Sequence, residues 1–92
     1  MRTESNPTTP KVAASKTINL PNIQLGDQGQ TVKLAQKILI ANRYLGSDSF
    51  DGNFGQKTEQ AVKNYQHSHS LVVDGVVGVQ TWENLIKDIH HF

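Results

Sequence analysis

The chain has no cysteine, and this absence removes several kinds of chemistry at once. Disulfide bonds, thiolate nucleophiles and cysteine-based zinc sites are all excluded. An excess of charge of one sign is also lacking, because residues 23–92 carry six basic and seven acidic side chains. Nucleic-acid binding rests on lysine and arginine clustered at phosphates, so this near-neutral segment argues against a nucleic-acid partner. With 92 residues, the chain has room for one small domain.

Long apolar segments are missing as well. No apolar run approaches the length of a membrane span, so we expect no membrane partner. No apolar stretch follows Arg2 as in a signal peptide, so a cytoplasmic location stays open. Residues 1–22 are rich in polar residues and proline, and contain too little apolar surface to offset the entropy of ordering. We interpret residues 1–22 as a disordered tail or linker and residues 23–92 as the domain.

What the chain does contain is a short pattern that occurs twice, 23 positions apart. Residues 51–58 and residues 74–81 both read Asp-Gly-x-apolar-Gly-x-x-Thr. Asp-Gly pairs mark tight turns, because glycine tolerates positive φ and aspartate can accept a bond from its own backbone. The second glycine stands where a helix should begin, which places the threonine in the first helical turn. The pattern predicts two similar loops, each leading into a helix.

Helical periodicity fills the rest of the domain. Apolar residues recur at helical spacing over residues 28–42, after Gly55 and again after Gly78. Asp27 and Gln30 resemble a capping box for the first of these helices. The sequence therefore predicts an all-α fold, a compact bundle of three short helices joined by Asp-Gly loops.

The first two helices share the element Val-Lys-x-x-Gln, which ends at Gln36 and at Gln66. A buried side-chain amide needs hydrogen-bond partners. We therefore expect both glutamines, on the inner edges of their helices, to bond loop backbone. Short strand pairing by residues 23–25 or 72–73 is compatible with this arrangement but not required by it.

No group of residues points to a metal, a cofactor or catalysis. Neither loop has the carboxylates or the final glutamate of an EF-hand calcium site. His67 and His69 lie two positions apart, so on a helix they face different directions. No nucleophile with a base, and no carboxylate pair, follows a known catalytic order. We expect no metal site, no cofactor and no enzymatic activity.

The aromatic residues divide between the helices and the loops. Tyr65 and Trp82 fall on inward helical faces, which predicts core packing. Tyr44 and Phe54 lie in or beside loops, where they could either pack inward or stack on a sugar. Phe50 is interpreted as a plug beneath its turn.

Three stretches, in order, carry a resemblance to a known family. The matching residues are Gly26, Gly29, Val32 and Gln36, then Asp51, Gly52, Phe54, Gly55, Thr58, Ala61, Val62 and Gln66, then Leu71, Asp74, Gly75, Val77, Gly78, Thr81, Trp82 and Leu85. Over roughly residues 23–87 the chain resembles the bacterial peptidoglycan-binding domain of the three-helix type. That domain accompanies cell-wall amidases, transpeptidases and lytic enzymes.

Two departures from the family pattern have structural consequences. Tyr65 stands where the family has phenylalanine, so its hydroxyl needs a partner if the ring is buried. Ser70 replaces the glycine that commonly ends the second helix, so a left-handed conformation there would be slightly strained.

The resemblance implies a non-catalytic module that binds peptidoglycan, through the glycan strand, the stem peptide or both. It implies a location in the cell wall or periplasm, where the module anchors a cell-wall hydrolase or transpeptidase. No heptad repeat calls for assembly, so we expect a monomer. The candidate binding residues are Tyr44, Asp51, Asn53, Phe54, Asp74 and Gln80. For both aspartates the alternative is that they only brace their turns. The alternative function is a protein-interaction module that reuses the same fold inside the cell.

Overall fold

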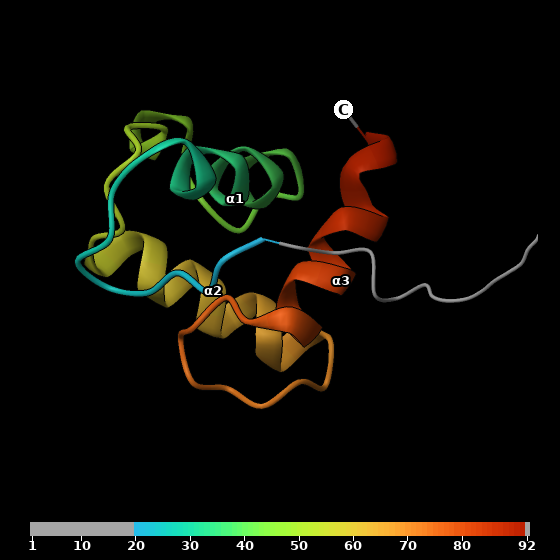
Figure 1. Ribbon diagram of the computed structural model, residues 1–92. Helices are drawn as coiled ribbons and strands as arrows, with labels where there is room; N and C mark the ends of the chain where they lie inside the picture. Colours follow the sequence, from blue (N-terminus) through green and yellow to red (C-terminus); the bar gives the residue numbers. More distant parts are fainter. Residues whose placement is uncertain (1–19, 92) are drawn as a thin grey trace, which may run out of the picture.

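Three α-helices form the domain in the computed structural model, which describes residues 20–91 (Figure 1). In chain order the elements are α1 (Gln30–Ala41), the short 3₁₀ helix η2 (Ser47–Ser49), α2 (Gln56–Ser68), α3 (Val79–Lys87) and a final 3₁₀ turn, η3 (Asp88–His91). Helix α1 packs against both α2 and α3. The described part of the chain contains no β-strand, so the predicted all-α class is confirmed. The predicted tail falls almost wholly outside the described residues.

The core lies where the inner faces of the three helices meet. Its largest fully buried side chains are Trp82, Tyr65, Phe54, Ile38, Leu39 and Leu85. Burial of one such side chain contributes roughly 1.5–3 kcal/mol, which is a large amount beside the net stability of roughly 5–15 kcal/mol that is usual for a domain. The predicted core positions of Tyr65 and Trp82 are confirmed. Among the described residues that precede residue 23, Leu20 packs against the core.

Each α-helix begins directly after a glycine, namely Gly29, Gly55 and Gly78. The predicted starts after Gly55 and Gly78 are confirmed. The predicted capping box is wrong, because Gly29 is the N-cap of α1 and no side chain caps that helix. The Asp27 carboxylate instead accepts a hydrogen bond from the backbone N–H of Gln24, at 2.9 Å. Asp27 therefore closes the turn that precedes the helix.

The segment before α1 joins the two Asp-Gly loops. In Figure 1 it runs, blue to cyan, from the start of α3 to the loop before α2. Ile23 pairs with Val77 through two backbone bonds of 3.2 and 2.9 Å, and Gln28 forms a second isolated bridge with Asn53. The pairing that the sequence allowed at residues 23–25 thus occurs, at Ile23 alone. Both loops are held to the same piece of chain.

Helix α2 ends in the strained manner expected from its sequence. Ser70, two residues beyond the helix, has φ of +57°, the left-handed region that favours glycine. The N–H of Leu71 then donates to the carbonyl oxygen of Gln66 at 2.9 Å, which turns the chain towards the second loop. None of the helices in residues 20–91 combines the length and apolar character needed to span a bilayer.

Candidate functional site

The first loop, residues 51–55, is organised by one side chain of α1. Gln36 is fully buried, and its Nε2 lies 3.1 Å from Asp51 Oδ1, 3.0 Å from the Asn53 carbonyl and 3.1 Å from Thr58 Oγ1. Its Oε1 accepts a bond of 2.9 Å from the N–H of Gly52. A side chain that bonds so many loop groups fixes the loop's shape, because its buried amide keeps its hydrogen-bond partners only while the loop holds this conformation.

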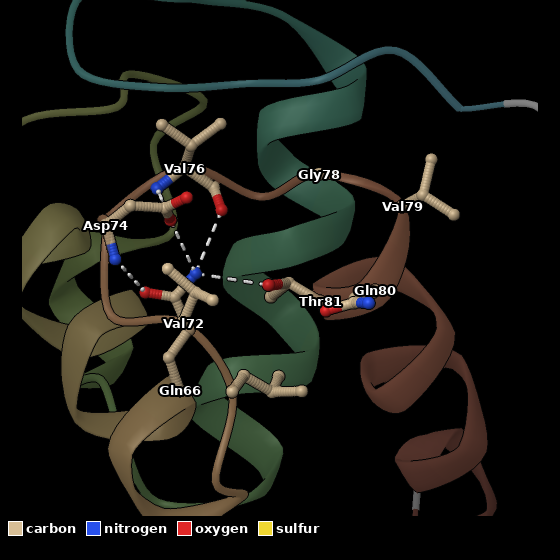
Figure 2. Close-up of a pocket in the computed structure, with 9 residues that line it drawn as sticks. Gln66, Val72, Asp74, Val76, Gly78, Val79, Gln80 and Thr81 are labelled. Atoms are coloured by element: carbon tan, nitrogen blue, oxygen red, sulfur yellow. Dashed lines mark hydrogen bonds between the residues drawn. The ribbon is translucent and has the colours of Figure 1, made fainter.

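The second loop, residues 74–78, is organised in the same way by Gln66 of α2. As Figure 2 shows, Gln66 Nε2 donates towards three acceptors, Asp74 Oδ1 at 2.9 Å, the Val76 carbonyl oxygen at 3.0 Å and Thr81 Oγ1 at 3.1 Å. The N–H groups of Asp74 and Gly75 donate to Gln66 Oε1. The prediction that Gln36 and Gln66 bond loop backbone is confirmed.

Glycine is required at the turn of each loop. Gly52 has φ of +78° and Gly75 has φ of +76°, and both are buried. A Cβ on Gly75 would also lie 3.1 Å from the side chains of Glu59 and Lys63 on α2. These conditions explain the Asp-Gly pairs, since a side chain at either position would meet both backbone strain and a neighbouring side chain.

Both aspartates brace their turns with one carboxylate oxygen. Asp51 Oδ1 accepts a bond from the N–H of Asn53, and Asp74 Oδ1 accepts one from the N–H of Val76, each at 2.9 Å. This backbone bond, followed by the glutamine amide, holds the pKa of each carboxyl below its ordinary value. Both groups are exposed and ionised at neutral pH. In the described part of the chain, Oδ2 of Asp74 accepts no hydrogen bond.

The six predicted binding residues do not share one hollow. Tyr44 lines a hollow of about 370 Å³ together with Asp48, Lys57 and residues of α2. Asp74 and Gln80 line a different hollow of about 300 Å³ beside the second loop. Asn53 is exposed, and it joins the fold through its backbone.

The structure decides between the two roles left open for Phe54, and it contradicts the position predicted for Phe50. Phe54 is 2% exposed, so its ring belongs to the core and has no face to stack on a sugar. Its backbone pairs with the segment before α1, which pulls the ring inward. Phe50 is the reverse case, because it was expected beneath its turn but is 47% exposed. The Lys33 ammonium lies 5.5 Å from the Phe50 ring centroid, in cation–π range.

The hollow beside the second loop, hereafter the second-loop crevice, separates the segment that leads into the loop from the start of α3 (Figure 2). Val72 on one wall is 73% exposed and Val79 on the other is 58% exposed. Asp74 and Gln80 add a carboxylate and an amide to the lining. Sequence reasoning missed the two valines, because an apolar residue before a turn or at the start of a helix gives no local sign of whether it is buried or exposed.

A second polar cluster joins the end of α2 to η3. The Tyr65 hydroxyl donates to Asp88 Oδ2 at 2.6 Å, which supplies the partner that its burial demands. Burial, together with this bond, raises the pKa of Tyr65. His69 stacks on the Tyr65 ring with centroids 3.9 Å apart, and its Nε2 lies 3.6 Å from the same Asp88 oxygen. Tyr44 meets Tyr65 edge to face at 5.1 Å, so much of its ring serves packing. Among the described side chains no three His, Asp or Glu residues gather as a metal site would require.

These features define a class of protein, a three-helix domain with two glutamine-braced Asp-Gly loops. Residues 28–85 match the family described as "Putative peptidoglycan binding domain". The chain belongs to this family, peptidoglycan-binding domain 1.

Solved structures agree with that assignment, and one curated protein is similar in sequence. The N-terminal domain of SleB is 36% identical with a TM-score of 0.70, and the match covers 73% of this chain and 90% of that domain. A fused Zn-dependent amidase/peptidase/peptidoglycan-binding protein from Clostridium acetobutylicum is 37% identical with a TM-score of 0.63, over 71% of this chain and 28% of that one. An uncharacterised protein from the bpoA1 3′ region of Kitasatospora aureofaciens is 39% identical over 66 residues, 71% of this chain. The match spans 55% of that relative's length.

Proposed function

We propose that this chain binds bacterial peptidoglycan without catalysing a reaction on it, and so holds a cell-wall enzyme at its substrate. The membership of the peptidoglycan-binding family carries the proposal. The domain occurs in cell-wall enzymes, and the amidase/peptidase from Clostridium acetobutylicum has such a domain fused to its catalytic part. The hydrolase or transpeptidase served here would lie on the same polypeptide or associate with it, in the cell wall or periplasm.

The second-loop crevice is the site that we favour for this binding. It combines exposed apolar walls with a carboxylate and an amide, as ligand sites generally do. Its floor is rigid, because Gln66 bonds both the loop and the Thr81 hydroxyl. A preformed crevice loses little entropy on binding, and a polymer with many sites allows rebinding after each dissociation. Weak affinity at one site therefore suffices to retain a monomer on the wall.

Co-sedimentation with insoluble peptidoglycan tests the proposal. The native chain should be retained in the pellet, whereas heat-unfolded chain should not, because the crevice exists only in the folded domain. Chitin, a polymer of related sugar without peptide stems, serves as the matched control and should retain less protein. A native chain that stays in the supernatant at high micromolar concentration would contradict the proposal and favour a protein-interaction role for the same fold.

A further inference from the structure

The two loops are braced in the same way but differ in the charged side chains beside them. In the first loop region, the Lys57 ammonium lies 3.9 Å from the Asp48 carboxylate, so this copy contains a cation of its own. The corresponding positions, 23 residues further on, are Gln80 and Leu71. No basic side chain lines the second-loop crevice. The second copy therefore has the same braced aspartate as the first but lacks a lysine at that position.

The carboxylate of Asp74 has an oxygen left for a ligand. Its Oδ1 is used by Gln66 and by the N–H of Val76, while its Oδ2 accepts no bond from any described residue. No lysine, arginine or histidine side chain among the described residues forms an ion pair with it. Asp74 is exposed, and its lowered pKa keeps it ionised at neutral pH. The crevice thus presents one fixed negative charge that attracts a cationic group.

The side chains that line the crevice are better suited to an aliphatic group than to a sugar ring. Sugars are commonly held by the flat face of an aromatic ring, and no aromatic side chain lines this crevice. Val72 and Val79 are aliphatic and exposed, which suits methyl and methylene groups. An aliphatic chain that ends in an ammonium group fits both the walls and the charge. Within peptidoglycan, that chemistry belongs to the diamino acid of the stem peptide.

We propose that the second-loop crevice binds the stem peptide of peptidoglycan, with Asp74 pairing to the side-chain ammonium of its diamino acid between Val72 and Val79. This assignment rests on the proposed function and narrows it from the polymer to one of its parts. The neutral glycan then serves as the carrier of many stems, and retention on the wall depends on how many of those stems have a free amine.

Calorimetric titration of the full chain with the soluble tripeptide L-Ala-γ-D-Glu-L-Lys tests the pairing. Acetylation of the lysine Nε removes its charge and should weaken binding roughly three- to fivefold, the range of a partly exposed ion pair. Asp74→Asn should weaken binding of the free-amine tripeptide by the same factor and abolish the difference between the two peptides. That non-additivity identifies Asp74 and the ammonium as partners.

Two further variants guard against a merely structural effect. Asp51→Asn makes the same change in the first loop, where the same bonds exist, and should leave tripeptide binding unchanged. Gln80→Lys gives the second copy the lysine of the first and should weaken binding, because a second positive charge in the crevice lining would repel the ammonium of the ligand. Equal binding of the acetylated and free tripeptides, no binding of either, or a loss caused by Asp51→Asn rather than Asp74→Asn would each overturn the assignment.

A sedimentation comparison separates this inference from the proposed function. Intact peptidoglycan should retain the chain, and glycan strands stripped of their stems by an amidase should not. Equal retention by both materials would overturn the stem-peptide assignment while leaving wall binding in place. Failure of intact peptidoglycan to retain the chain would overturn both.

Discussion

Replacement of Gln66 by leucine should destabilise the whole domain, because this one side chain holds the second loop. The change keeps the approximate volume but removes every bond to the loop. The N–H of Gly75 lies in a buried residue and would lose its acceptor. Thr81, which is 4% exposed, would lose the amide beside its hydroxyl. Each buried polar group left unpaired costs about 1–3 kcal/mol, so the expected loss is roughly 3 kcal/mol after the gain from a buried leucine.

That loss is large for a chain of this size. Domains of about 100 residues are stable by roughly 5–15 kcal/mol, and 1 kcal/mol shifts their Tm by about 4–8 °C. Gln66→Leu should therefore lower the Tm by about 15 °C, as measured by thermal melting followed with circular dichroism. Gln60→Leu is the matched control on the same helix, since Gln60 is exposed and bonds only Asn64. It should change stability by less than about 0.5 kcal/mol. A Gln66→Leu variant that melts with the control would refute the account of the loop.

Three further changes test the turns and the polar clusters. Gly75→Ala should cost about 1–2 kcal/mol in urea unfolding because φ is +76° there, whereas Gly55→Ala, with φ of −98° and open space around it, should be nearly neutral. Because the pKa of Asp74 is lowered in the folded chain, its carboxylate stabilises the fold at pH values above the ordinary pKa of 3.8. This contribution is lost as the pH falls through the pKa of the folded state. The difference in unfolding free energy between the native chain and Asp74→Asn should therefore shrink when urea unfolding is measured at acid pH. Tyr65→Phe removes the bond to Asp88 and should cost about 1–2 kcal/mol at neutral pH. Because the pKa of Tyr65 is raised above 10.0, the native chain should lose stability above that pH, and this loss should be absent from the variant.

Each of these has an outcome that would contradict it. Equal losses from the two glycine substitutions would show that backbone conformation is not the cause. A constant gap between the native chain and Asp74→Asn from neutral to acid pH would show that the carboxylate charge is not stabilising. A parallel decline of the native chain and Tyr65→Phe above pH 10 would assign the alkaline sensitivity to another group.

The helices and the loop bracing were predictable because they follow from local rules. Glycine before each helix, positive φ after each aspartate and a buried amide in need of partners are constraints that neighbouring residues impose on one another. For this reason the starts after Gly55 and Gly78, and the roles of Gln36 and Gln66, followed from the sequence.

Most errors arose where contacts between segments far apart in the sequence decide how a side chain is placed. Phe54 is buried because the segment before α1 pairs with its backbone, and the spacing around Phe54 says nothing of that segment. Asp27 is the exception, a local error, because its side chain bonds the N–H of Gln24 three residues earlier and does not cap the helix. The second-loop crevice depends on where the start of α3 lies relative to Val72, a tertiary relation with no local signal. For the same reason the sequence did not show that Tyr44 lines one hollow while Asp74 and Gln80 line another.

The most direct test of the central claim is a heteronuclear NMR titration of the labelled chain with soluble peptidoglycan fragments. The account predicts that the largest shift changes fall on amides of residues 71–81, around the second-loop crevice. Smaller changes are expected at residues 44–53, whose hollow and loop lie outside the proposed contact. Shift changes centred on residues 44–53, or none at saturating fragment concentration, would contradict the account.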